Sequence, residues 1–491
     1  MKILFINPPF LPRFSRESRS PSVTKSNTMY YPHWLCYAAA YVYKNNDVEI
    51  DVIDAAPLNI QYSSLTIRIK NFSPDIVVVD TSTPSIYSDL TFASNIKKDS
   101  NNALVVMVGP HVSATIHETF EFCQSNKLNI DFILHGEYEK TLSELIEAIR
   151  NKKTPYDIKG LAFQKSGEIQ VNGKSDFLHE LDNFEFVSKI YNKFLNIPDY
   201  FMAHTKYPMV TLISGRGCTS RCSFCQLPQV MHGHEFRTRS VDNLIDELKY
   251  IKSEMPFVKG IMFEDDTFPS DKQRVLELCE KIVENGLDYL EYTCNARANV
   301  SRDTLNAMHK AGFRMMCVGF ESGDQVVLNA MRKGTKRNII KKFVADSKIE
   351  GVKIHGCFMY GNKGETKETL KNTLDFALNL DIDSAQFYPI MVSPGTEDYE
   401  YYKEKKLLKS EDFSQWNDAQ GQHKTTILRE EITDDELEQF CDYSRRRFYL
   451  RPKYIFMKGV ESIFDYSHLK KNIRGAAVLL RHLVYKPGAS L

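Results

Sequence analysis

The residues best suited to chemistry are three cysteines grouped in one loop. Residues 208–214, PMVTLIS, have the composition of a buried strand, and Cys218, Cys222 and Cys225 follow it with the spacing C-x3-C-x2-C. Thiolates at this density bind soft metals, and iron–sulfur clusters are usually held by four of them. Three ligands leave one metal position open, which is how a metal centre binds a substrate or a cofactor. The spacing therefore predicts an iron–sulfur centre with an open site.

Two other interpretations of these cysteines remain open at the level of residue types. A zinc ion could be bound by the same loop and completed by a remote cysteine or by a histidine such as His232 or His234. The three thiols could also be reduced and buried without a metal. Among the other cysteines, Cys294, Cys317 and Cys357 lie within expected strands, where a radical-relay or substrate role is the alternative to filling the core.

The cysteine loop opens a series of apolar runs that alternate with helical patterns. Six such βα units in about 190 residues predict a barrel or partial barrel, with its chemistry at the carboxyl ends of the strands. The expected strands are 208–214, 260–265, 290–296, 315–321, 352–361 and 384–391.

The first 150 residues show a similar alternation, but their apolar runs read as strands buried on both faces. The runs are 2–7, 48–54, 75–80, 103–109 and 131–136. Such runs separated by helices predict a parallel sheet covered on both sides. A sheet of this kind binds ligands at the carboxyl ends of its strands. The polar or flexible residues expected at those ends include Thr83, Gly109, His111, Gly136 and Glu137.

The composition is that of a globular protein and argues against several functions. Of 491 residues, 42% are apolar and 26% are charged, so the chain can bury a large core. Lys+Arg and Asp+Glu both number 63, and a net charge of zero gives no support for a protein that coats nucleic acid. No apolar stretch approaches the length of a spanning helix. The ten cysteines, with no export signal before them, are expected to be reduced in the cytoplasm.

The loop C-T-S-R-C-S-F-C, with Phe224 before the third cysteine, resembles that of the radical S-adenosylmethionine (SAM) enzymes. The resemblance implies that Cys218, Cys222 and Cys225 bind three irons of a [4Fe-4S] cluster and that SAM binds the fourth. It also implies that one electron from the cluster cleaves SAM to a 5′-deoxyadenosyl radical. Such enzymes need an external one-electron reductant, for example a flavodoxin or a ferredoxin.

Further segments resemble the family over about 205–400. They are G-I-M-F-E-D-D-T-F (260–268), C-N-A-R-A-N (294–299), G-F-E-S-G-D-Q-V-V-L-N-A-M-R-K-G-T (319–335) and G-C-F-M-Y-G-N-K-G-E-T (356–366). The resemblance implies contacts to SAM from Phe224, Glu264, Asp265, Asp266, Arg297, Glu321, Ser322 and Gly361. A solvated helix cap is the alternative for Asp266, and a structural ion pair is the alternative for Arg297.

The N-terminal part is similar to the flavodoxin-like cobalamin-binding domain fused to many radical SAM enzymes. Its matching segments are 31–41, 108–114 and 135–142. The strand-end residues Thr83, Gly109, His111, Gly136 and Glu137 are expected to contact cobalamin if it binds, and a helix cap is the alternative for His111. Val108 and Tyr138 replace glycines of the family pattern, and no D-x-H-x-x-G motif offers a lower ligand for cobalt. Some relatives keep this domain without the cofactor, so its binding here is an expectation that needs a test.

These features together predict an α/β protein of four parts. A flavodoxin-like doubly wound parallel sheet (1–151) and a linker (152–205) precede a partial (β/α)6 barrel (206–400) and a helical C-terminal region (401–491). From residue 443 onward there are eleven Lys or Arg and two acidic residues, which indicates either a solvated basic face or contact with a membrane surface.

The expected function is radical modification of an sp³ carbon in a biosynthetic small molecule. With cobalamin the reaction would be methyl transfer. Without it, dehydration, oxidation or rearrangement of a sugar- or lipid-like substrate would follow the same radical. A non-catalytic iron–sulfur sensor is the third hypothesis. A related role, methylthio transfer to RNA, is disfavoured, because such enzymes carry extra N-terminal cluster cysteines and a C-terminal RNA-binding barrel. Here the N-terminal half holds only Cys36 and Cys123, far apart, and the C-terminal region reads as helical, so no nucleic-acid partner is expected.

Overall fold

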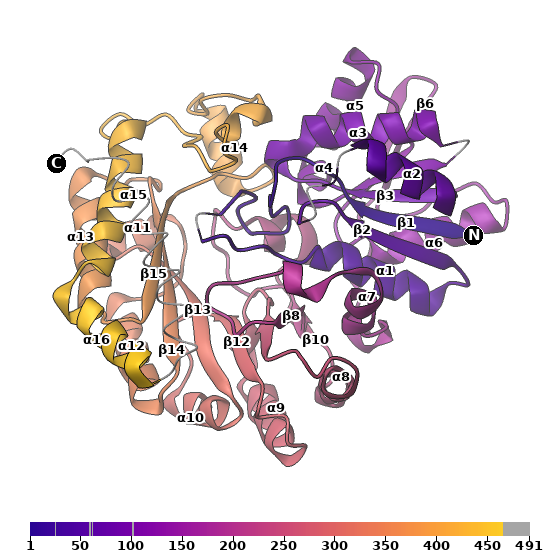
Figure 1. Ribbon diagram of the computed structural model, residues 1–491. Coiled ribbons are helices and arrows are strands. Elements are labelled where there is room, and N and C mark those ends of the chain that lie inside the picture. The colour runs from indigo at the N-terminus through magenta and orange to yellow at the C-terminus, as the bar shows by residue number, and fades with distance from the viewer. Residues whose placement is uncertain (25, 58–59, 61, 101–102, 465–491) are drawn as a thin grey trace.

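The computed structural model describes residues 1–464, apart from 25, 58–59, 61 and 101–102. Two sheets form its framework, and they lie next to one another with helices around each (Figure 1). A two-stranded ribbon, β9 (Gly215–Arg216) with β10 (Arg237–Thr238), lies apart from both sheets and encloses the cysteine loop. The chain is therefore an α/β protein, as its alternating pattern predicts.

The first sheet has seven strands in the order β2-β1-β3-β4-β5-β6-β7. Its first five strands are parallel, and their order is that of a flavodoxin-like doubly wound sheet. Nearly every residue in these strands is buried because helices cover both faces. The strands are β1 (Lys2–Asn7), β2 (Glu49–Asp54), β3 (Ile76–Asp80), β4 (Leu104–Val108), β5 (Phe132–Leu134), β6 (Leu161–Lys165) and β7 (Glu168–Val171).

The helices of this unit divide between the two faces of the sheet. In Figure 1, α1 and α6 lie on one side, while α2, α3 and α5 lie on the other. The bounds are α1 (His33–Asn45), α2 (Tyr62–Phe72), η1 (Thr83–Ser85), α3 (Ile86–Asp99), α4 (Pro110–Ala114), α5 (Ile116–Ser125) and α6 (Glu139–Arg150).

Within the connecting segment, β6 and β7 form an antiparallel hairpin. Both strands run antiparallel to their neighbours and extend the first sheet at the edge of β5. The rest of the connecting segment holds η2 (Leu181–Asn183), α7 (Val187–Phe194) and η3 (Ile197–Asp199).

The second sheet has six parallel strands in the order β15-β14-β13-β12-β11-β8, which is the order of the chain. Sequential βα units of this kind form a partial barrel whose helices lie outside. The strands are β8 (Met209–Leu212), β11 (Gly260–Phe263), β12 (Glu291–Ala296), β13 (Phe313–Glu321), β14 (Lys353–Tyr360) and β15 (Ser384–Pro389). The helical elements are η4 (Leu227–His232), α8 (Val241–Glu254), η5 (Phe268–Ser270), α9 (Lys272–Glu284), α10 (Arg302–Lys310), α11 (Gln325–Ala330), α12 (Arg337–Glu350) and α13 (Lys367–Asn379).

The C-terminal region holds the remaining helices, and α15 packs against the outer face of β15. An irregular segment, 405–433, separates α14 from α15 and contains a single 3₁₀ turn. The elements are α14 (Glu397–Glu404), η6 (Phe413–Trp416), α15 (Asp434–Tyr449) and α16 (Pro452–Phe464).

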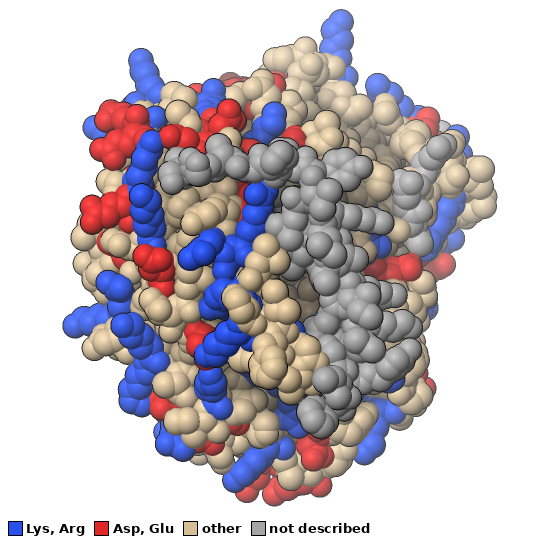
Figure 2. All heavy atoms as spheres, turned by 60° about the vertical axis from the view of Figure 1, so that its left-hand side comes forward, with Lys and Arg blue, Asp and Glu red and all other residues tan. Residues whose placement is uncertain are grey.

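The basic tail expected from residue 443 lies only partly within the described residues. Arg445 donates to the Phe387 carbonyl, Arg451 donates to the Leu378 carbonyl, and Lys453 pairs with Asp381. On the face that Figure 2 shows, Lys and Arg lie among Asp, Glu and uncharged residues. In the described part of the chain, every helix is too short or too polar to cross a bilayer.

The carboxyl ends of the two sheets face one another. Loops that follow β4, β8 and β15 meet at Gly395, where an added Cβ would lie 2.7 Å from the Val230 side chain and 2.8 Å from that of Ala114. Arg19, in the connection that follows β1, also reaches the second sheet at Asp266. Parallel sheets bind ligands at the carboxyl ends of their strands, and here those ends of the two sheets border the same region.

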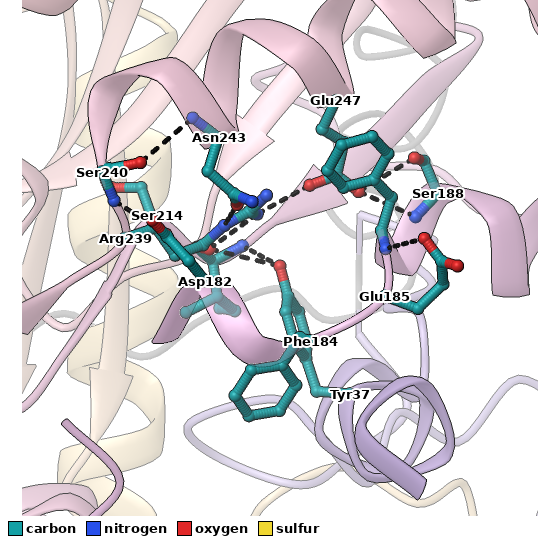
Figure 3. Close-up of polar contacts among 12 residues, drawn as sticks. Tyr37, Asp182, Phe184, Glu185, Ser188, Ser214, Arg239, Ser240, Asn243 and Glu247 are labelled. Carbon is teal, nitrogen blue, oxygen red and sulfur yellow. Dashed lines mark hydrogen bonds and ion pairs between the residues drawn. The ribbon is translucent and has the colours of Figure 1, made fainter. Parts of the chain in front are cut away.

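A buried polar network holds this arrangement from the side of α7 and α8 (Figure 3). Arg239 pairs with Glu247 at 2.6 Å, and the side chains are 5% and 0% exposed. The Ser188 amide and hydroxyl on α7 donate to the other oxygen of Glu247 at 2.9 and 2.8 Å. Nearby, the Tyr37 hydroxyl on α1 donates to the Ile213 carbonyl at 3.2 Å and accepts from its amide at 2.7 Å. The first unit, the connecting segment and the barrel are therefore joined by buried hydrogen bonds and an ion pair.

Replacing Glu247 with Gln tests this junction. Removing one charge from a buried pair typically costs about 3–5 kcal/mol, because the remaining charge stays buried without compensation. We expect Glu247→Gln to lower the urea midpoint of unfolding clearly. Asp242→Asn is the control, because Asp242 pairs with Lys281 but is 80% exposed. Equal midpoints for the two variants would contradict the role given to the network.

Candidate functional site

The cysteine loop is held at its base by the short ribbon of β9 and β10. Gly217 stands at the turn into the loop with φ of 84°, and an added Cβ would lie 2.0 Å from the Glu235 carbonyl oxygen. Only glycine avoids this collision. The Cys218 amide then donates to the Gly233 carbonyl at 3.4 Å, so both ends of the loop lie together.

The π-helical turn η4 carries the side chain that organises the loop. The Gln229 amide nitrogen donates to the carbonyls of Cys222, Ser223 and Cys225 at 3.2, 3.2 and 2.9 Å. Its oxygen accepts from the Glu397 amide at 3.0 Å. Because π turns often occur at functional sites, this geometry supports a role in fixing the loop's shape.

The three cysteine thiols are spaced too widely for one metal ion. Two thiolates on one zinc lie at most about 4.6 Å apart, since each Zn–S bond is about 2.3 Å. Among the described residues, Cys218, Cys222 and Cys225 do not all come within 4.8 Å of one another, and neither His232 nor His234 completes such a group. The thiols therefore fit a cluster of several irons better than a zinc ion. Burial raises the pKa of the Cys225 thiol to about 12.

Cations lie beside the thiols. The Arg297 guanidinium is 3.7 Å from the Cys222 sulfur, and it also donates to the Lys333 carbonyl. The Lys333 ammonium lies 5.9 Å from the centroid of the Phe224 ring, which is half-buried in the same loop. A cluster with thiolate ligands carries negative charge, so these groups suit its surroundings.

Glu321 lies at the end of β13 in a conformation unusual for a residue with a side chain, with φ of 64°. Its Oε1 accepts from the Lys333 ammonium at 2.7 Å. Its Oε2 is buried and has no hydrogen-bond partner among the described residues. A Cβ on Gly319 would lie 2.3 Å from Glu321 Oε1, so this glycine makes room for the side chain. The unsatisfied oxygen suits a donor from a bound ligand.

Glu264 and Asp266 follow β11 and share one arginine. Arg19, from the loop after β1, lies 3.7 Å from Glu264 and 3.2 Å from Asp266. Burial alone would raise the pKa of Asp266, but a hydrogen bond from His232 and the nearby Arg19 hold it below its usual value. Glu264 Oε2 is buried and lacks a hydrogen-bond partner within the described part of the chain. This carboxylate therefore has an oxygen to offer a ligand.

Three of the residues predicted to contact SAM already contact other groups of the protein. Asp265 accepts from the Ser214 amide at 2.6 Å and from its hydroxyl at 2.5 Å, and burial raises its pKa to about 6. The Ser322 hydroxyl lies 2.9 Å from that of Thr373 on α13. Gly361 has φ of 84°, and a Cβ there would meet the Arg429 guanidinium at 2.5 Å. These residues brace the strand ends in this structure.

Thr83, Gly109 and His111 gather at the carboxyl end of the first sheet. His111 Nδ1 lies 3.1 Å from the Thr83 hydroxyl. The histidine ring is 1% exposed and meets the Phe413 ring edge-on at 4.8 Å, so the segment 405–433 covers it. Burial lowers the pKa of His111 to about 3 and keeps the ring neutral. Gly109 has φ of 116°, and a Cβ there would lie 2.8 Å from the Thr81 carbonyl oxygen.

Glu137 joins the first sheet to the cysteine ribbon. It accepts from Arg237 on β10 at 2.5 Å and lies 3.8 Å from Arg216 on β9, which also binds Glu139 at 2.6 Å. All four side chains are 3% exposed or less. Gly136 has φ of 76°, and no atom of the described residues lies within 4 Å of an added Cβ. In this structure Glu137 fastens the two units together, while Gly136 borders open space.

Buried polar atoms without partners mark the same edge of the first sheet. Asp80 Oδ2, the Tyr138 hydroxyl and Glu139 Oε2 are all buried and lack a hydrogen-bond partner among the described residues. Such groups are costly unless something satisfies them. Burial raises the pKa of Asp80 to about 7. A ligand that offers several hydrogen-bond donors, as the amide-bearing corrin ring does, fits this edge.

Sequence reasoning missed Arg19, Lys333 and Gln229. Lys333 falls within the family-like segment 319–335, so the motif contained a usable signal. Arg19 lies in an irregular loop far from every motif, and Gln229 acts through backbone carbonyls. Only the folded chain brings these two to the site.

Comparison with known proteins agrees with this geometry. Residues 212–377 match the family model of the radical SAM superfamily. An uncharacterized methyltransferase of Pyrococcus horikoshii is 30% identical over 97% of this chain and 98% of its own. The anaerobic magnesium-protoporphyrin IX monomethyl ester cyclase of Cereibacter sphaeroides is 26% identical over 92% of this chain and 71% of its own.

A solved structure shares the fold. The radical SAM methyltransferase TsrM from Kitasatospora setae, with cobalamin and a [4Fe-4S] cluster bound, superimposes with a TM-score of 0.68. The match covers 91% of this chain and 88% of that one at 15% identity. Both sheets and the helices around them therefore belong to a known architecture.

The Gly217→Ala variant tests the shape of the cysteine loop. The new methyl group would collide with the Glu235 carbonyl, so we expect the loop to open and iron retention after anaerobic reconstitution to fall well below about four per chain. Gly167→Ala is the matched control, since Gly167 has φ of 87° but no atom within 4 Å of an added Cβ. Full iron content in Gly217→Ala would show that the loop tolerates the change.

Proposed function

Because the chain belongs to the radical SAM superfamily, we propose that this enzyme is a cobalamin-dependent methyltransferase. Its substrate would be a biosynthetic small molecule, methylated at an sp³ carbon. The observation that carries the proposal is a relative called a methyltransferase that matches nearly the full length of both chains. The fold likeness to a structure with cobalamin bound supports it.

Different residues of the chain would bind the different cofactors. In this proposal Cys218, Cys222 and Cys225 bind three irons of the [4Fe-4S] cluster, with Phe224 beside them. Cluster, SAM and cobalamin, when bound, supply a 5′-deoxyadenosyl radical and a methyl group. Glu264 and Glu321, each with an unsatisfied buried oxygen, would accept hydrogen bonds from SAM.

Arg297 and Asp266 have positioning roles. Arg297 contacts the Cys222 sulfur and would balance negative charge at the cluster and the SAM carboxylate. Asp266 holds Arg19 over the carboxyl end of the second sheet. Three other predicted contacts would act only by bracing the backbone: Asp265, Ser322 and Gly361. The side chains of Asp265 and Ser322 already bond to other protein groups, and the space beside Gly361 is filled by Arg429.

Cobalamin would lie at the carboxyl end of the first sheet. Gly136 leaves open space there, and Asp80, Tyr138 and Glu139 present unsatisfied polar atoms. Thr83, Gly109 and His111 line the same edge under the segment 405–433. This segment and the loop at 8–32 would exclude water from the space between the sheets.

A second candidate is radical chemistry without methyl transfer. The cyclase relative, which covers 92% of this chain, favours it. Dehydration, oxidation or rearrangement would then yield 5′-deoxyadenosine without S-adenosylhomocysteine.

The third hypothesis, a non-catalytic sensor, leaves the unsatisfied oxygens of Glu264 and Glu321 without a role. In each enzymatic case an external one-electron reductant is required, and a membrane contact through the basic tail stays a prediction.

Cobalt retention separates the two enzymatic candidates. We expect the chain, reconstituted anaerobically with iron, sulfide and hydroxocobalamin and then gel-filtered, to retain about one cobalt and about four irons per chain. Cobalt near zero beside an intact cluster would contradict methyl transfer through cobalamin. With cobalt retained, a substrate screen should yield S-adenosylhomocysteine and 5′-deoxyadenosine together.

The Cys218→Ala, Cys222→Ala and Cys225→Ala variants test the cluster assignment one ligand at a time. Each is expected to lose the violet absorbance of the cluster and SAM cleavage, because two thiolates cannot hold the cluster in place. Cys279→Ala, on α9 and remote from the loop, is the control. Retention of iron and cleavage in any of the three would overturn the assignment.

Glu321→Gln tests the contact to SAM. A hydrogen bond to a charged group contributes about 1.5–3 kcal/mol, so we expect the affinity for SAM to fall roughly 10- to 150-fold. The cluster should remain, because Glu321 is not one of its ligands. Glu368→Gln, at an exposed position on α13, is the control and should bind SAM as the unmodified chain does.

A further inference from the structure

Two cysteines unrelated to the cluster loop face the interior of the partial barrel. Cys317 on β13 and Cys357 on β14 are half-buried, whereas the residues next to them in each strand are fully buried against the helices. Strand side chains alternate, so both thiols point away from the helical layer. Cys294 on β12 is 0% exposed and belongs to the helical side. The structure thus separates Cys294 from the other two barrel cysteines.

The two thiols lie together with a histidine. Cys317 Sγ is 3.7 Å from Cys357 Sγ, and a ring nitrogen of His355 completes a group whose ligand atoms all lie within 4.8 Å of one another. No other group of three such atoms meets this limit among the described residues. Zn–S bonds of about 2.3 Å at a tetrahedral angle place two sulfurs about 3.8 Å apart. The observed separation matches that of two thiolates on one zinc ion, and it is also that of two thiols in hydrogen-bond contact.

The histidine is also held as a metal ligand would be. His355 Nδ1 lies 2.9 Å from the Ser384 hydroxyl on β15, and its ring stacks on His204 with centroids 5.4 Å apart. A metal-bound histidine almost always uses its second ring nitrogen in such a contact, which fixes the ring's orientation. Binding through Nε2 would leave the Ser384 contact in place.

We propose that Cys317, Cys357 and His355 bind one zinc ion in the barrel interior. Binding would release two protons, one from each thiol, so the two thiolates balance the charge of Zn²⁺. Three protein ligands leave the fourth position for water or for a donor atom of a substrate, as in catalytic zinc sites. Tyr30 and Tyr388 lie close enough to interact electrostatically with both thiols, so the interior has further polar groups around the site.

The substrate role of this fourth position rests on the proposed function, but the metal site does not. A substrate held there by an oxygen, nitrogen or sulfur atom would lie against β13 and β14, and β13 carries Glu321 at its end. The site would then select small molecules with a metal-binding group. Zinc content does not depend on SAM cleavage, so failure of either idea is visible separately.

Metal analysis of the anaerobically reconstituted full chain tests the site. After incubation with Zn²⁺ and gel filtration, we expect about one zinc besides about four irons per chain. Zinc X-ray absorption should show two sulfurs at about 2.3 Å and at least one nitrogen at 2.0–2.1 Å. Zinc far below one per chain, or a shell of three or more sulfurs, would overturn the proposal. So would a Cys317–Cys357 disulfide in the anaerobic protein, seen as a mass loss of two hydrogens.

Variants locate the zinc. Cys317→Ala with Cys357→Ala should lose zinc and keep iron, while Cys294→Ala should keep both, because Cys294 faces the helices. Retention of zinc in the double variant would overturn the assignment. If the double variant does not fold, the absorption spectrum of the unmodified chain still decides, since it reads the ligands directly.

Discussion

The buried charges between Glu137, Glu139, Arg216 and Arg237 are the interaction on which the rest of the site depends. They fasten the ribbon of β9 and β10 to the loop that follows β5. That ribbon is the frame of the cysteine loop, so the first sheet fixes where the thiols stand. Groups buried this deeply cost free energy unless they are paired, and removing either side leaves an isolated charge. The relative position of the two units is therefore tied to the geometry of the cysteines.

These ion pairs hold the two units so that the carboxyl ends of their parallel sheets face the same space. Each end carries buried polar atoms that no described residue satisfies, on Asp80, Tyr138 and Glu139 at one side and on Glu264 and Glu321 at the other. A single sheet could bind one cofactor at such an end. Two sheets that face each other can hold two cofactors with a substrate between them, which is what methyl transfer by a radical route requires.

The interior of the barrel adds a second constraint. In a partial barrel, alternate residues of each strand point away from the helices, and the cluster loop, Glu264 and Glu321 stand at the ends of these strands. Cys317, Cys357 and His355 lie on the same inner side, three to five residues before the ends of β13 and β14. A metal bound by these side chains would lie in the barrel interior, below the strand ends that carry the cluster loop, Glu264 and Glu321. Its open coordination position would then favour substrates with a metal-binding group.

The sequence by itself determined the two βα series and the cysteine loop, because strand burial, helix periodicity and the C-x3-C-x2-C spacing are local patterns. Through its resemblance to a known family, the sequence also pointed to Glu264, directly after β11, and to Glu321, at the end of β13. The tertiary structure alone decided which neighbours those residues have. Glu137 turns from an expected ligand contact to an ion-pair partner because Arg237 lies opposite, 100 residues away along the chain. Arg19 reaches Asp266 across 247 residues, and the Cys317–His355–Cys357 group needs the register of two strands. Pairings over such separations depend on packing, and no local pattern records them.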